Sequence, residues 1–128
     1  MKFIAFIILS VFSNSLFSQA KNMDSTYSIE IIRYKIESAN TSSFEKAYAD
    51  AGKLLQSSPQ CQGYQLIRGV DEPGKYIVII HWTSKEEHLQ GFRKSQVFQS
   101  FFNLVKPFYS NIEEMKHYEG TGTRWNRQ

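Results

Sequence analysis

The sequence predicts an α+β fold, a ferredoxin-like split βαβ with an antiparallel sheet, which pairs into a dimeric α/β barrel. The predicted elements follow the order β-α-β-β-α-β, and a short turn joins the two central strands as a hairpin. The strand at 76–82 is apolar in both alternate sets of residues, so both of its faces should be covered. The chain's own helices supply one cover, and a second subunit or a ligand cavity supplies the other.

Residues 1–20 have the pattern of a secretory signal peptide. Lys2 supplies the positive charge, residues 3–12 are almost entirely apolar, and Ser18-Gln19-Ala20 is a small-x-small cleavage site. The apolar run is short for a membrane span, although an uncleaved anchor is an alternative. A polar lead-in, residues 21–26, follows. The pattern predicts a secreted or periplasmic protein with no membrane span after signal removal.

The mature chain is predicted to be one small domain with a mild charge. Fifteen Lys and Arg residues less Lys2 leave 14 against 12 acidic residues, a net charge of +2. This balance, without a basic block, does not indicate nucleic-acid binding. Cys61 is the only cysteine, so an intrachain disulfide is excluded. Its thiol is buried, free at the surface, or bridged to a second chain.

Two β-rich segments precede the central strand. Residues 27–36 predict the first strand, whose charged residues alternate outward or into a cavity. Its core-facing residues are Ile32, Tyr34 and Ile36. Residues 63–70 predict the second strand, and the Asp-Glu-Pro-Gly sequence at 71–74 predicts a turn in which glycine accepts a positive φ.

Between these strands the sequence predicts an amphipathic helix. Apolar residues recur at helical spacing over 44–55, and the helix should end before Ser58-Pro59. Ser42 and Glu45 have the spacing of a capping box at its start. The helix therefore supplies one cover for the sheet.

The central strand runs into a second capped helix. Ser84 and Glu87 form another capping box, which satisfies backbone donors at a helix start. This helix places His88 and Phe92 on one face, four residues apart, with Arg93 just beyond it. It carries the most distinctive polar residues of the chain.

The C-terminal third predicts one more helix and one more strand. Ser95 can cap a helix whose apolar face lies over 97–105, and Pro107 ends it. Its aromatic residues have the spacing of core residues. Residues 108–119 form a weaker fourth strand, and 120–128 are a polar tail.

Several short motifs together resemble the antibiotic biosynthesis monooxygenase (ABM) domain family. The resemblance covers residues 27–119 and depends on the order and spacing of the motifs. They are Tyr64–Arg68, Trp82-Thr83-Ser84 with His88, Gly91-Phe92-Arg93 with Ser95, Pro107-Phe108-Tyr109 and His117-Tyr118-Glu119. The resemblance implies a homodimeric barrel with a pocket between sheet and helices. Family members include cofactor-free oxygenases of phenols or quinols, haem-degrading enzymes, and proteins without known activity.

His88 and Arg93 are the candidate catalytic residues. A neutral imidazole can take a proton from an acidic phenol or quinol, which leaves an electron-rich anion that reacts with oxygen. Arg93 can stabilise the developing negative charge. The alternatives are a histidine that only forms a hydrogen bond near the helix start and an arginine that forms an ordinary salt bridge.

Five further residues are candidates for the substrate pocket. Tyr34, Trp82 and Phe92 can form flat aromatic walls, for which core packing is the alternative. His117 and Tyr118, near the end of the last strand, can complete either the pocket or the dimer seam. The sequence leaves these two roles open.

The sequence predicts no metal site and no cofactor. Its three histidines, His81, His88 and His117, have no compact ligand spacing. No glycine-rich phosphate loop supports a nucleotide or flavin, and no nucleophile elbow supports hydrolase chemistry. In the haem-degrading branch of the family, a helix histidine ligates iron; Phe102 occupies that position here, and an apolar ring is no ligand.

Two functions follow from these features. The first is a cofactor-independent monooxygenase that acts on a small aromatic or quinol-like compound outside the cytoplasm. The alternative is a non-catalytic small-molecule-binding or structural dimer of the same fold. Oxygen uptake with a panel of quinols and phenols distinguishes them.

Overall fold

The computed structural model describes residues 27–128. The predicted signal peptide and polar lead-in, residues 1–26, lie outside the described residues. The main elements are β1 (Ser28–Lys35), α1 (Thr41–Ser57), β2 (Cys61–Arg68), β3 (Lys75–Trp82), α2 (Gln96–Val105) and β4 (Ile112–Tyr118). Four short helical segments join them, namely η1 (Ser38–Asn40), η2 (Glu87–Gly91), η3 (Phe92–Lys94) and η4 (Lys106–Asn111).

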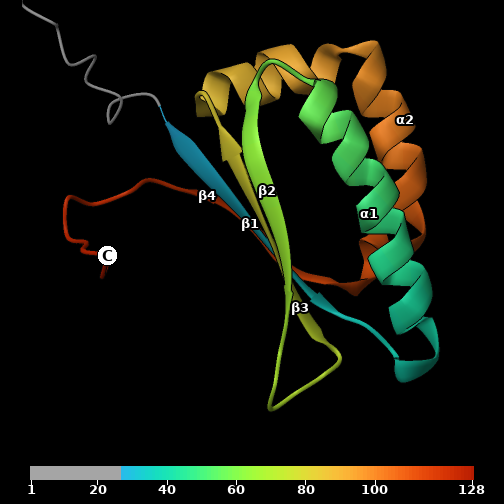
Figure 1. Ribbon diagram of the computed structural model, residues 1–128. Coiled ribbons are helices and arrows are strands. Elements are labelled where there is room, and N and C mark those ends of the chain that lie inside the picture. The colour runs from blue at the N-terminus through green and yellow to red at the C-terminus, as the bar shows by residue number, and fades with distance from the viewer. Residues whose placement is uncertain (1–26) are drawn as a thin grey trace, which may run out of the picture.

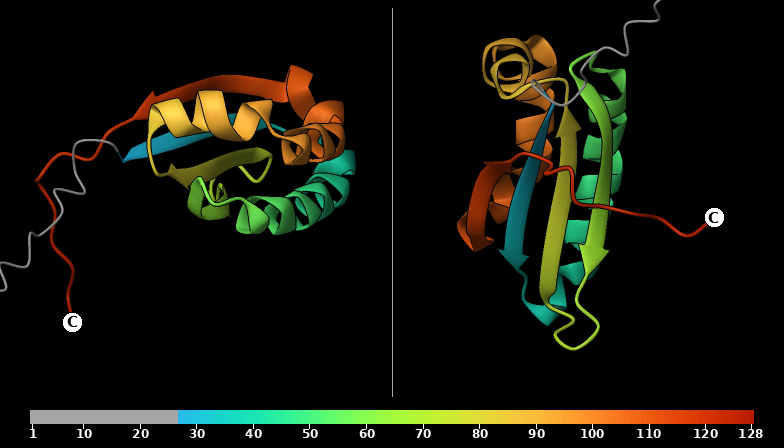
Figure 2. Two further views of the ribbon diagram at one scale, coloured as in Figure 1. Left: turned by 90° about the horizontal axis from the view of Figure 1, so that it is seen from above. Right: turned by 90° about the vertical axis from the view of Figure 1, so that its left-hand side faces the viewer.

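The four strands form one antiparallel sheet in the order β2-β3-β1-β4, with α1 and α2 on one face (Figure 1). This arrangement confirms the predicted ferredoxin-like fold and the hairpin between β2 and β3. The right-hand view of Figure 2 looks onto the other face of the sheet, with the helices behind it. No helix within 27–128 is both long and apolar enough to span a membrane.

The core lies between the sheet and the helices. On β3, alternate residues from Tyr76 to Trp82 are at most 1% exposed, and they pack under the helices. The other alternate set, including Ile77 and Ile79, is half-buried within this single chain. The predicted core face of β1 is also confirmed, because its residues there are at most 5% exposed. Apolar side chains on both faces of one strand are what a buried central strand requires.

The prediction of a capping box at the start of α1 is wrong. The helix begins at Thr41, directly after η1, so Ser42 already lies inside it and caps nothing. Glu45 instead accepts a hydrogen bond from the Tyr76 hydroxyl at 2.9 Å and pairs with Arg68 at 3.5 Å. Glu45 therefore makes tertiary contacts with the sheet instead of a local cap at the helix start. By contrast, Ser84 and Ser95 do accept hydrogen bonds at their helix starts.

The bounds of β2 and β4 also differ from the prediction. β2 begins at Cys61 and ends at Arg68, each two residues earlier than predicted, and a bulge between Cys61 and Gly63 shifts its register against β3. β4 begins only at Ile112, since 3₁₀ helix η4 extends over the predicted first residues of that strand.

The free thiol of Cys61 is half-buried, and this burial raises its pKa.

The β2–β3 turn needs glycine for a reason other than the one predicted. No described glycine has a positive φ, so that part of the turn prediction is wrong. At Gly74 an added Cβ would lie 2.7 Å from the Ile36 carbonyl oxygen, which is closer than real Cβ contacts allow. The same close approach lets the Ile36 N–H donate to the Gly74 carbonyl at 2.8 Å. Glycine therefore permits the backbone contact that fixes this end of the sheet.

Candidate active site

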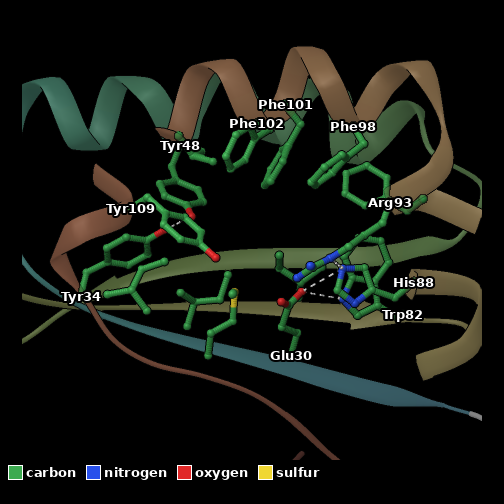
Figure 3. A pocket seen from close by; sticks show the side chains of 16 residues that line it. Glu30, Tyr34, Tyr48, Trp82, His88, Arg93, Phe98, Phe101, Phe102 and Tyr109 are labelled. Carbon is green, nitrogen blue, oxygen red and sulfur yellow. Dashed lines mark hydrogen bonds and ion pairs between the residues drawn. The ribbon is translucent and has the colours of Figure 1, made fainter. Parts of the chain in front are cut away.

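A cavity of about 70 Å³ lies between the sheet and α2 (Figure 3). Its walls are mainly aromatic and include Phe98, Phe101 and Phe102 from α2. One end holds polar and charged side chains, and the other end holds tyrosines. The polar end consists of Glu30, Trp82, His88 and Arg93; the tyrosine end consists of Tyr34, Tyr48 and Tyr109. An apolar hollow with a few convergent polar groups is the usual form of a small-molecule site.

Glu30 is the central acidic group of the polar end. It lies on the helix-facing side of β1, and its side chain is almost completely buried at 2% exposure. Its Oε2 accepts a hydrogen bond from Trp82 Nε1 at 3.0 Å and lies 3.5 Å from His88 Nε2. Burial raises the pKa of Glu30, whereas the Trp82 hydrogen bond and the charge of Arg93 oppose the rise. A raised pKa makes the Glu30 carboxylate a stronger proton acceptor than an ordinary glutamate.

His88 lies beside Glu30 and is also buried. Its ring stacks on Trp82, with ring centroids 4.2 Å apart and planes 10° apart. One ring nitrogen, Nε2, accepts from Arg93 Nε at 3.4 Å, and the other, Nδ1, lies 2.7 Å from His117 Nε2. Burial, followed by the charge of Arg93 and by His117, lowers the pKa of His88 to about 3. The imidazole is therefore neutral at physiological pH.

A π-helical turn brings Arg93 to His88. In η2 the Phe92 N–H donates to the carbonyls of both Glu87 and His88, and the former is an i→i−5 bond. The wider turn lets side chains five residues apart meet, which a regular α-helix would place on different sides. His88 and Phe92 are both buried, as the four-residue spacing predicted. Arg93 joins them at the cavity although much of the residue stays exposed.

His117 approaches His88 from the edge strand. It is the direct cross-strand partner of Glu30, so both side chains leave the sheet on the helix side. The residue is half-buried. Burial lowers its pKa, and the charges of Lys85 and Arg93 lower it further. Glu30, His88 and His117 thus come together from β1, η2 and β4.

The sequence matches the antibiotic biosynthesis monooxygenase family over residues 28–104. The chain belongs to this family. It is 26% identical over 76 residues to the uncharacterized protein YczJ of Bacillus subtilis (strain 168), a match that covers 59% of this chain and 80% of YczJ.

Solved structures with the same fold include two that bear on the ABM family. A protein of Bordetella bronchiseptica, classed as an antibiotic biosynthesis monooxygenase, superposes with a TM-score of 0.67 at 24% identity, over 75% of this chain and 98% of that one. SnoaB, a cofactor-independent oxygenase from Streptomyces nogalater, superposes with a TM-score of 0.61 at 15% identity, over 81% of this chain and 100% of that one. At these identities the likeness establishes the fold.

In this ABM protein, five of the seven residues named from the sequence line the cavity. They are Tyr34, Trp82, His88, Phe92 and Arg93. His117 contacts His88 but is not among the cavity-lining residues. Tyr118 lies outside the cavity of its own chain, because its side chain is exposed and its hydroxyl donates to Glu114. Alternation along β4 explains the difference, since adjacent residues point to opposite faces.

Glu30 and Tyr48 were missed by the sequence analysis. Glu30 precedes Ile32 and Tyr34 in the same alternate set, so the signal was a carboxylate on an otherwise apolar core face. Tyr48 has ordinary core spacing on α1, and nothing local distinguishes it. Its hydroxyl lies 2.6 Å from that of Tyr34. Burial raises the pKa of Tyr34 to about 12 and that of Tyr48 well above its usual value, so both hydroxyls keep their protons.

The polar end of the cavity also places three potential metal ligands together. Donor atoms of Glu30, His88 and His117 lie within 4.8 Å of one another, a proximity that the sequence spacing did not reveal. However, Glu30 and His117 contact different ring nitrogens of His88, and these point away from each other. Arg93 also adds positive charge on the Nε2 side. This arrangement favours a chain of polar contacts over a chelate in which all three groups converge on one ion.

Proposed function

We propose that this protein is a monooxygenase that uses dioxygen to oxidise a small hydroxylated aromatic compound of the quinol type. The observation that supports the proposal is the aromatic cavity with Glu30, His88 and Arg93 at one end. The rings suit a planar apolar substrate, and the polar end suits its hydroxyl group. Membership of the ABM family supports the same reaction class.

In the proposed reaction, the substrate hydroxyl gives its proton to Glu30. The resulting anion is stabilised by the guanidinium of Arg93 and is electron-rich enough to react with dioxygen. The substrate loses its O–H and one C–H hydrogen and gains one oxygen atom as a carbonyl. The second oxygen atom leaves with the two hydrogens as water. This stoichiometry balances without any further reductant.

This proposal changes the role assigned to His88 from the sequence. Because the pKa of His88 is lowered to about 3, its imidazole does not retain an added proton at neutral pH. Glu30, whose pKa is raised by burial, is the better acceptor and faces the same cavity. His88 lies beside it as a neutral ring, with Nε2 3.5 Å from the carboxylate.

The cavity must widen when such a substrate binds. Its 70 Å³ is far below the several hundred Å³ that drug-sized ligands fill. Tyr109 is the most exposed ring of the lining, at 51%, and Phe102 next to it is half-buried. We infer that these two rings move aside to admit the substrate.

Oxygen uptake by the purified, chelator-treated protein with a panel of quinols and phenols tests the function. We expect uptake with at least one compound, and His88→Ala should lower turnover by about 10²-fold because it removes the neutral ring that lies 3.5 Å from Glu30 and stacks on Trp82. Gln90→Ala, an exposed change on the same turn, is the matched control and should keep full activity. If no compound supports uptake above background, the protein is instead a small-molecule-binding or structural dimer.

We further propose that the protein is a homodimer that closes the barrel through the uncovered face of the sheet. Half-buried isoleucines gather there on the two central strands. They are Ile29, Ile31, Ile77 and Ile79. Ile31 and Ile79 are direct cross-strand partners, so a self-complementary apolar patch lies at the centre of the sheet.

Ile79→Asp should dissociate the dimer, because it would bury an unpaired charge at the centre of this patch. Light scattering at micromolar concentration measures the effect, and circular dichroism separates dissociation from unfolding. Val70→Asp, on a side chain that is 92% exposed in the β2–β3 loop, is the control and should leave the dimer intact. A wild-type protein that is monomeric at this concentration would contradict the proposal.

The location outside the cytoplasm is also a proposal, based on the signal-peptide pattern of residues 1–20. N-terminal sequencing of protein from the host's envelope fraction should begin at Lys21. Recovery of the intact chain from the membrane would instead support the uncleaved anchor.

A further inference from the structure

The two histidines of the polar end form a continuous path of polar contacts with Glu30. His88 Nε2 lies 3.5 Å from Glu30 Oε2, and His88 Nδ1 lies 2.7 Å from His117 Nε2. A neutral imidazole has a proton on one nitrogen and a lone pair on the other. Because His88 is contacted at both nitrogens, it can take a proton on one side while it releases one on the other.

The starting tautomer follows from Arg93. Its Nε–H donates to His88 Nε2 at 3.4 Å, so that nitrogen carries the lone pair and Nδ1 carries the proton. Nδ1 then donates to His117 Nε2. Nε2 can receive a proton from Glu30 once the Arg93 N–H turns from Nε2 toward the substrate anion and the 3.5 Å gap shortens, as catalytic hydrogen bonds often do when substrate binds.

The path leads from the interior to solvent. Glu30 is 2% exposed, whereas His117 is half-buried on β4, which is an edge strand paired only with β1. The cationic groups that face His117 are Lys85, at the start of the helical segment, and Arg93 on η3. Both charges lower its pKa and so favour release of a proton to water.

We propose that His88 and His117 form a proton relay between Glu30 and solvent at the β4 edge of the sheet. This inference rests on the proposed oxygenase function. When Glu30 has taken the substrate proton, its Oε2–H passes to His88 Nε2 while the Nδ1 proton of His88 passes to His117 Nε2. His117 gives up its own Nδ1 proton to water, and Glu30 is again a carboxylate.

The second half of the reaction resets the relay. Dioxygen takes up two electrons as its bond to the substrate carbanion forms, which leaves a peroxide anion. A proton then returns along the same path in reverse and protonates the peroxide. Loss of water breaks the O–O and C–H bonds and gives the carbonyl. One proton thus moves out and one moves in, so both histidines regain their starting tautomers.

The low pKa of His88 agrees with a role in passing a proton on and argues against a role in holding one. An imidazolium ion at this position would be buried beside Arg93, and its pKa of about 3 keeps it unpopulated at neutral pH. Transfer through the ring in one concerted step avoids that charged state. The charged and titratable groups that face His88 are Arg93 on η3, His117 on β4 and Glu30 on β1.

The first arm of the test needs no substrate. Nitrogen-15 NMR of the purified protein should show His88 as a single neutral tautomer between pH 5 and 8, with a scalar coupling between His88 Nδ1 and His117 Nε2 across their hydrogen bond. His117→Ala should remove the coupling and shift the His88 nitrogens. The signals of His81, which alternates onto the opposite face of β3, should stay unchanged and serve as the internal reference. Absence of the coupling in the wild type overturns the relay.

The second arm measures turnover on any compound that supports oxygen uptake. His117→Ala should lower kcat by about 10-fold or more with little change in KM, and millimolar imidazole should restore part of the loss by filling the vacated position. Glu119→Ala, an exposed change two residues along, is the control. Full activity in His117→Ala, or a loss that imidazole does not repair, overturns the relay. If no compound supports uptake, the proposed function fails, and the NMR arm still decides whether the path exists.

Discussion

Replacing Glu30 with glutamine should lower turnover by about 10²- to 10⁴-fold, the usual scale for losing a general base. The amide keeps the size of the side chain and can still accept the hydrogen bond that Trp82 Nε1 donates at 3.0 Å. It cannot take the proton of the substrate. The loss should therefore fall on kcat, with KM nearly unchanged.

Two measurements make this expectation specific to the carboxylate. Thermal unfolding of Glu30→Gln should show no loss of stability, because an uncharged group replaces a buried carboxyl that has only one hydrogen bond within normal distance. Glu37→Gln, an exposed change just beyond β1, is the matched control and should retain full activity. Substantial turnover by Glu30→Gln would transfer the role of proton acceptor to another group.

The second large effect concerns stability in acid. The folded-state pKa of His88 is lowered from 6.5 to about 3, so below pH 6.5 the unfolded chain binds this proton and the folded chain does not. The free energy of unfolding should therefore fall as pH drops through this window. One proton contributes up to about 1.4 kcal/mol per pH unit.

Glu30 acts in the opposite direction over part of the same range. Its pKa is raised above 4.5 in the folded state, so the folded chain binds this proton first and gains stability as pH falls toward 4.5. The contribution of His88 is therefore partly offset above pH 4.5 and is full between 4.5 and about 3.

Urea unfolding from pH 7.5 to 3.5 measures these contributions. The wild type should lose stability faster than His88→Asn, which has no titrating ring and so removes the acid penalty. Comparison of the two profiles cancels the acid titration of partly exposed carboxylates such as Asp50 and Glu114, whose pKa values are lowered by neighbouring hydrogen bonds and charges. Parallel profiles for the two proteins would show that burial of His88 does not shift its titration.

The strands and helices themselves could be predicted from patterns among residues that are close in sequence. Alternation along 76–82 and the helix caps at Ser84 and Ser95 depend on local backbone geometry, so each was visible in the sequence and is present in the structure. The order of these elements then limited the topology to one familiar sheet. The motifs around Trp82 and Arg93 were enough to indicate the family.

The cap predicted at Ser42 shows the limit of such local signals. Ser42 and Glu45 have the right spacing, but η1 extends the helical turn backward, and Glu45 bonds instead to Tyr76 and Arg68 on the sheet. Two partners distant in sequence thus replaced a local bond. Residues whose important contacts are with partners distant in sequence therefore show no local pattern that would reveal their function.

The polar end of the cavity was decided by tertiary structure alone. The register of β1 against β4 places Glu30 opposite His117, and the π-turn of η2 places His88 above both with Arg93 alongside. None of these contacts joins residues at a spacing that regular periodicity predicts. Burial then sets the proton affinities, lowering that of His88 and raising that of Glu30, because desolvation disfavours the charged form of each. The sequence alone determined the fold and the aromatic walls, whereas strand register, one wide helical turn and exclusion of water determined which groups can exchange a proton.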